Sequence, residues 1–159
     1  MNAAGSGLPV DPRVASLWSR AKLLVWPERY VLASLPSSAL PESARLLSSS
    51  AGKFAALVAE RDEVSLTVEQ GVWSNSELRR QARGAAGPLR SITLDLQLDL
   101  DVCGFLAPAA VRLAAAGISI VPQCGYLKDH LLVHESNLER TVEVLEAFIL
   151  GCRRQTFQE

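Results

Sequence analysis

Apolar and polar residues alternate strictly over residues 91–102, SITLDLQLDLDV. The apolar positions are Ile92, Leu94, Leu96, Leu98, Leu100 and Val102. Successive side chains of a strand point to opposite faces, so a period of two predicts a strand with one buried and one solvated face. This alternation is the strongest local signal in the chain.

Two helices are predicted in the second half of the chain. Residues 104–117 suit a helix because Pro108 is tolerated in a first turn and Gly117 is a natural stop. A capping box at residues 136–139 begins the second helix, which we expect to end near Gly151. The expected apolar stripes are Phe105, Ala109 and Leu113 on the first helix, and Leu138, Val142, Leu145 and Ile149 on the second.

A short hairpin is predicted between these helices. ISIVPQ at residues 118–123 and HLLVH at 130–134 are typical of strands, and CGYLKD between them is typical of a turn. Proline cannot donate a hydrogen bond to a strand ladder, so the strand that contains Pro122 is expected at a sheet edge.

The first half repeats this order of elements with weaker patterns. GAAGP at residues 84–88 is expected to mark the boundary between the halves. The predicted elements are a short helix after Pro12, strands at 22–26 and 29–35, a helix at 41–49, a hairpin of 54–60 and 63–70, and a helix N-cap at Ser74 or Asn75.

A βαββα order with antiparallel hairpins predicts an α+β fold of two tandem ferredoxin-like units, with helices packed on one face of each sheet. Such a unit needs a fourth strand beside its first, and the residues after Gly151 are too few and too polar to form one. We therefore expect residues 22–26 to fill that place, with a strand from a second copy of the chain as the alternative. The expected division is a flexible leader and short helix at 1–21, halves at 22–87 and 88–152, and a tail at 153–159.

The amino-acid composition excludes several classes of function. Lys and Arg total 16 against 17 Asp and Glu, a formal net charge of -1, which excludes a broad basic surface for nucleic acid. No apolar run reaches the ~20 residues that a bilayer span needs, and the first residues lack a signal-peptide pattern. The cysteines Cys103, Cys124 and Cys152 lack CxxC spacing, which favours a reducing compartment. We expect a cytoplasmic protein without nucleic-acid or membrane partners.

The second half resembles the small tandem ACT-like proteins, the branch that includes the cytosolic arginine sensors. The first half resembles their N-terminal half through PERYVLASLP and FAALVAERDEVSLTVE, so the match covers roughly residues 22–150. The matching positions in the second half are Asp101, Cys103, Gly104, Phe105, Leu106, Ala116, Gly117, Ile118, Ser119, Tyr126, Asp129, His130, Leu132, Val133 and Glu135.

The resemblance implies a non-catalytic regulatory protein that binds an amino acid where the first strand meets the first helix, opposite the hairpin turn. Unpaired N–H groups near Gly104 suit an α-carboxylate, and aspartates suit an ammonium group. The run Asp99, Asp101 and Asp129 favours a basic amino acid. The expected ligand-binding residues are Asp101, Val102, Cys103, Gly104, Phe105, Cys124, Gly125, Tyr126, Lys128 and Asp129.

The hairpin departs from the family's pattern. Gly125 replaces a hydroxyl residue and Lys128 replaces a small polar one, so the ligand's identity does not carry over. A pure interaction module with an empty pocket is the second hypothesis; Gly104 would then serve helix–sheet packing, and the aspartates would be solvated. We expect a homodimer formed through the second half and a regulated protein partner. Arg79, Arg80 and Arg83 mark either a partner surface or a solvated face.

Catalytic and metal sites are the weakest hypotheses. Cys124, Asp129 and His130 are the residue types of a thiol relay, but adjacent strand residues point to opposite faces. His130 and His134 lie ~13 Å apart along a strand, too far to share one zinc with Cys103 and Cys124. No catalytic residue, metal ligand or cofactor is therefore expected.

Overall fold

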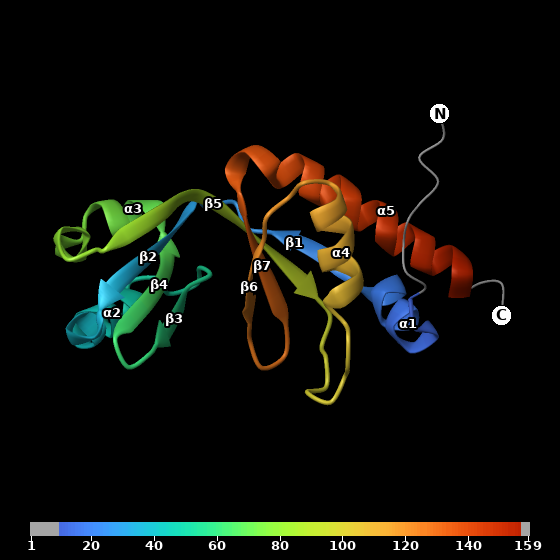
Figure 1. Cartoon of the computed structure of the whole chain (residues 1–159), viewed down its shortest axis with the longest axis horizontal. Helices are drawn as coiled ribbons and strands as arrows, with labels where there is room; N and C mark the ends of the chain where they lie inside the picture. Colours follow the sequence, from blue (N-terminus) through green and yellow to red (C-terminus); the bar gives the residue numbers. More distant parts are fainter. Residues whose placement is uncertain (1–9, 157–159) are drawn as a thin grey trace. The chain divides into compact units, whose positions relative to one another are not determined.

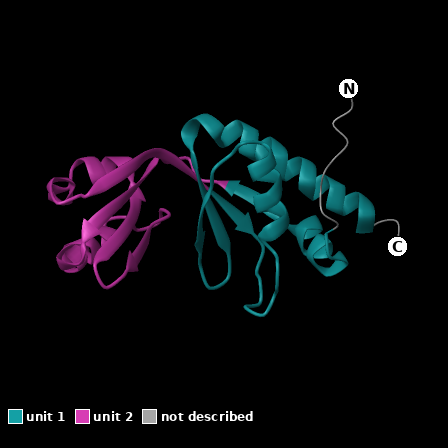
Figure 2. Cartoon of the chain, in the orientation of Figure 1, with its two compact units in different colours: residues 1–24, 92–159 teal, residues 25–91 magenta. Residues whose placement is uncertain are grey.

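The computed structural model describes residues 10–156 and divides into two compact units (Figure 2). Unit 1 combines residues 1–24 with 92–159, and unit 2 comprises residues 25–91. Residues 1–9 of the expected leader and residues 157–159 of the expected tail lie outside the described residues. No helix within residues 10–156 is both long and apolar enough to cross a membrane.

Unit 2 is a four-stranded antiparallel arrangement in the order β3-β4-β2-β5 (Figure 1). Its buried core includes Leu35, Leu66 and Leu78. Its elements are β2 (Tyr30–Pro36), η1 (Ser37–Ala39), α2 (Leu40–Ser48), β3 (Ala56–Ala59), β4 (Glu63–Glu69), α3 (Gln70–Ser74), η2 (Glu77–Arg80) and the first part of β5 (Gly84–Asp95).

Unit 1 has the strand order β1-β5-β7-β6. Trp18 of α1 is fully buried, stacked on Phe105 at 4.7 Å between ring centroids and tilted against Phe148 at 5.0 Å. Its elements are α1 (Pro12–Arg20), β1 (Lys22–Val25), the second part of β5, α4 (Ala107–Ala115), β6 (Val121–Cys124), β7 (Asp129–His134), η3 (Glu135–Asn137) and α5 (Leu138–Thr156).

The structure confirms the predicted α+β fold and the fourth strand. β1 pairs with β5, so the segment from Lys22 takes the place beside the first strand of the second half. This pairing also explains why residues 22–24 group with unit 1, whereas the expected halves had assigned them to 22–87. β6 lies at the sheet edge, as Pro122 predicted.

The predicted strand over 91–102 is wrong at both ends. β5 begins at Gly84, because residues 84–86 pair with Ser34, Ala33 and Leu32 of β2, so GAAGP is strand and not a boundary loop. β5 ends at Asp95, and Leu100 is 76% exposed. The expected wet face is wrong as well, since Ser91 and Thr93 are buried.

Both predicted ends of the last helix also differ. The last helix continues past Gly151 to Thr156, because Cys152 is buried and the Arg153 side chain donates to the carbonyl of Ser19 at 2.9 Å. The capping box at 136–139 is replaced by His134, whose Nδ1 accepts the Ser136 N–H ahead of the short helix η3.

In unit 2 the expected N-cap, Ser74 or Asn75, is wrong. Ser76 caps η2 by accepting from the Leu78 N–H at 3.2 Å. The preceding residues 70–74 form α3, which the sequence pattern did not predict.

Candidate functional site

A loop at residues 96–106 connects β5 to α4 in unit 1 and forms one wall of the candidate site. Gly104 has φ +78°, a left-handed backbone that only glycine adopts readily. The Val102 N–H donates to the Asp99 carbonyl at 3.1 Å, which tightens the loop into a turn. Because α4 begins at Ala107, the expected strand–helix junction is in fact this loop.

The β6–β7 hairpin forms the opposite wall. The Gly125 N–H donates to the Lys128 carbonyl at 2.9 Å and closes the turn. A Cβ at Gly125 would lie 3.1 Å from that carbonyl, so glycine permits this close approach. The Leu98 N–H donates to the Leu127 carbonyl at 3.1 Å and ties the loop to the hairpin.

A cavity of about 340 Å³ lies between these walls. It brings together eight of the predicted site residues but not Asp101 or Cys103, which line a neighbouring cavity beside α1. The eight are Val102, Gly104, Phe105, Cys124, Gly125, Tyr126, Lys128 and Asp129. The loop turns at Asp99–Val102, so successive residues there face different cavities.

Several lining residues were missed by sequence reasoning. They come from the segment read as the end of a strand and from the helix entry: Leu98, Asp99, Leu100, Leu106, Ala107 and Leu127. Asp99 had been noted only for its charge. The two aspartates followed closely by Gly104 are turn-forming residues, and that signal could have located the loop.

The charges at the cavity are unevenly paired. Lys128 forms an ion pair with Asp95, and this contact holds the pKa of the Asp95 carboxyl below its usual value. Asp99 and Asp129 line the cavity without an ion-pair partner among residues 10–156. Among the described residues, the cavity therefore offers two carboxylates to a ligand, while its lining cation Lys128 is already paired.

Cys124 is a poor nucleophile in this setting. Its thiol donates to the Asp129 carboxylate, and that hydrogen bond, together with partial burial and the carboxylate's charge, raises the pKa of Cys124 to about 11. Thiolate is the reactive form, so a raised pKa opposes covalent catalysis. His130 lies against Thr93, with 2.8 Å between Nδ1 and Oγ1, and burial lowers its pKa.

No group of three or more His, Cys, Asp or Glu side chains that could hold a metal ion occurs within residues 10–156.

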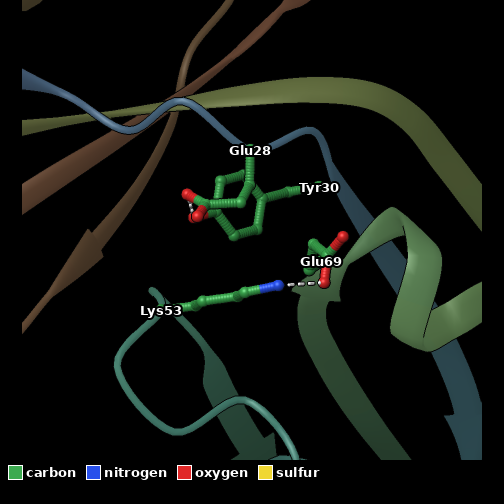
Figure 3. A network of polar contacts seen from close by, with 4 residues as sticks. All are labelled: Glu28, Tyr30, Lys53 and Glu69. Atoms are coloured by element: carbon green, nitrogen blue, oxygen red, sulfur yellow. Dashed lines mark hydrogen bonds and ion pairs between the residues drawn. The ribbon is translucent and has the colours of Figure 1, made fainter.

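Unit 2 contains a separate polar network beside its aromatic residues (Figure 3). The Tyr30 hydroxyl donates to Glu28 at 3.1 Å, and Lys53 pairs with Glu69 at 2.6 Å. Burial, and then the charge of Glu28, raise the pKa of Tyr30 well above its ordinary value. Tyr30 also packs edge-on against Phe54, which makes this network part of the unit's packing.

Comparisons with known proteins agree with this architecture. Residues 87–147 match a family model described as an ACT domain. No curated protein matches the chain.

Solved structures match over most of the chain. Protein VC0802 from Vibrio cholerae, titled a protein of unknown function and possible transport protein, is 21% identical, with 86% of this chain and 95% of that chain covered and a TM-score of 0.68. Protein Atu0741 from Agrobacterium tumefaciens is 24% identical over 81% and 89% of the two chains, with a TM-score of 0.65. The regulatory subunit of aspartate kinase from Thermus flavus is 12% identical over 80% and 95%, with a TM-score of 0.57. Residues 87–147 therefore match an ACT domain, and the α+β fold of the chain is like that of the regulatory subunit of aspartate kinase.

Proposed function

We propose that this protein is a non-catalytic regulatory protein that binds a small amino-acid ligand in the 340 Å³ cavity of unit 1. Ligand binding would be passed on through a second copy of the chain or a regulated protein partner. The observation that carries the proposal is the pairing of Lys128 with Asp95, which leaves Asp99 and Asp129 to receive an ammonium or guanidinium group.

The α-carboxylate of an amino-acid ligand also has candidate hydrogen-bond donors in the cavity. Gly104 and Phe105 line the cavity, and their N–H groups make no hydrogen bond within the part of the chain that the structure describes. Unpaired N–H groups just ahead of a helix attract a carboxylate. A basic amino acid fits both ends, so arginine and lysine are the first ligands to test. The fold of the aspartate kinase regulatory subunits supports the regulatory role.

A thermal-shift screen over the twenty amino acids tests the proposal, because a ligand specific for the folded state raises the melting temperature. Calorimetry then compares Asp129→Asn with Asp62→Asn, a matched change in the exposed hairpin turn of unit 2. Losing one charged hydrogen bond costs about 1.5–3 kcal/mol, so Asp129→Asn should weaken binding roughly ten- to a hundredfold. The control should bind like the parent. A ligand that binds both variants equally would place the site elsewhere.

The second candidate function is an interaction module with no ligand. The observation that favours it is the exposure of large apolar side chains at the cavity rim: Leu100 is 76% exposed and Tyr126 is 77% exposed. A partner surface, including that of a second copy, would cover them. Sedimentation of the parent and of Leu100→Ser, each with and without arginine, distinguishes the two. Ligand-independent dimers that Leu100→Ser dissociates would favour the module, and ligand-dependent assembly would favour the regulatory protein.

A further inference from the structure

A second, larger cavity of about 610 Å³ lies within unit 1, between α1, α4 and the turn at residues 101–104. Its walls are mainly apolar and include Val14, Leu17, Val102 and Val111. Pockets of ~300–1,000 Å³ with apolar walls and few polar groups are typical of small-molecule sites. Neither the ACT match nor the proposed amino-acid site accounts for this cavity.

The walls of the cavity are held firmly in place. Trp18 of α1 stacks on Phe105 at the end of the loop, and its indole Nε1–H donates to the Phe105 carbonyl at 2.8 Å. Arg153 of α5 holds the end of α1 through the Ser19 carbonyl. Because the walls are fixed before binding, the protein loses little conformational entropy when a ligand binds.

The chemistry of the ligand is indicated by Arg112, which lines the cavity from α4. Arg112 is half-buried, and its guanidinium lies 4.0 Å from the centre of the Phe148 ring and donates to the Pro108 carbonyl at 2.9 Å. No carboxylate within residues 10–156 pairs with it. An oriented, partly desolvated guanidinium has donors to spare and favours a planar carboxylate.

The other charged groups at the cavity limit the ligand's charge. Asp11 caps α1 by accepting the Arg13 N–H at 2.8 Å, and Asp101 is exposed on the loop. These two carboxylates outnumber Arg13 and would repel a second negative charge on the ligand. We infer that the cavity between α1 and α4 binds a small monocarboxylate with a branched aliphatic or aromatic body, its carboxylate on Arg112. This site shares the loop residues Val102 and Gly104 and the helix residue Ala107 with the proposed amino-acid site, but its charged group, Arg112, lines this cavity and not the other.

The probes are phenylacetate and 3-methylbutanoate, each compared with its neutral amide. Cys103 is exposed and lines the cavity, so its alkylation by iodoacetamide reports occupancy. We expect millimolar carboxylate to slow alkylation of Cys103 and the amide to leave it unchanged. Calorimetry on the same pairs should show roughly ten- to a hundredfold weaker binding of the carboxylate to Arg112→Gln.

Two further variants keep the proposal falsifiable if Arg112→Gln loses stability. Val111→Trp adds bulk at an exposed lining position and should block both carboxylate binding and the protection of Cys103. Leu150→Trp is the control, because it makes the same kind of change at an exposed α5 position outside this cavity. It should bind the carboxylate like the parent. Asp129→Asn should retain carboxylate binding, which separates this site from the amino-acid site. No protection by either carboxylate, or equal binding of acid and amide, would overturn the proposal.

Discussion

Replacing Gly104 by alanine isolates the energetic cost of the left-handed backbone in the loop that walls both cavities. The residue has φ +78°, and a Cβ built there meets no atom within 4 Å, so the substitution adds strain without a steric clash. A left-handed conformation costs an L-residue about 1–2 kcal/mol. Gly104→Ala should therefore lower the free energy of unfolding by that amount.

Gly151→Ala is the matched control within the same unit. It lies inside α5 and its new Cβ also meets nothing within 4 Å. Alanine is favoured over glycine in a helix interior by about 0.8–1.0 kcal/mol, so this variant should be more stable than the parent. The same chemical change is thus expected to have opposite signs at the two positions.

Urea unfolding followed by circular dichroism measures both effects. A shift of the midpoint at constant m-value reports a change in stability. The reasoning is refuted if the free energy of unfolding of Gly104→Ala differs from that of the parent by less than ~0.3 kcal/mol, which is the scatter within which the effects of independent substitutions usually add. It is also refuted if both variants shift in the same direction.

Three more predictions concern single polar contacts. Alkylation of Cys124 at pH 8 should be slow, because the contact with Asp129 raises the pKa of the thiol to about 11. Asp129→Asn should speed the alkylation, and equal rates for the parent and the variant, measured by peptide mass spectrometry, would contradict this prediction. Trp18→Phe leaves the buried Phe105 carbonyl without its donor and should cost about 1–3 kcal/mol in urea unfolding, and an unchanged midpoint would count against the contact. Tyr30 has a folded-state pKa raised above its ordinary 10.0, so its contribution to stability is complete below that pH and is lost as pH rises further. Tyr30→Phe should flatten this alkaline fall in melting temperature, and an identical pH profile would reject the assignment.

The sequence alone determined most of the secondary structure and the fold class. A local signal predicted the structure correctly where the cause of that structure is itself local. Pro122 cannot donate a hydrogen bond to a strand ladder and lies at a sheet edge, and Gly117, with φ +73°, follows the end of α4. The missing fourth strand was also predictable. The edge of β5 needed a hydrogen-bonding partner, and the apolar run at residues 22–25 had no other predicted place in the fold.

The ends of β5 were decided by tertiary structure. Period-two alternation continues through Val102, but a strand persists only where neighbours supply hydrogen bonds, and residue 98 bonds instead to the hairpin turn at Leu127. At the other end, GAAGP has the composition of a loop and is strand because β2 pairs with it.

The candidate site divides in the same way. Sequence reasoning named the strand–helix junction and the hairpin, and eight of the ten residues that it named do line one cavity. The sequence could not show that Asp101 and Cys103 line the cavity beside α1, or that Lys128 forms an ion pair with Asp95. Residue types and spacing reflect local backbone preferences, whereas the direction of a loop side chain and the partner of a charge depend on segments far away in the chain that only folding brings together.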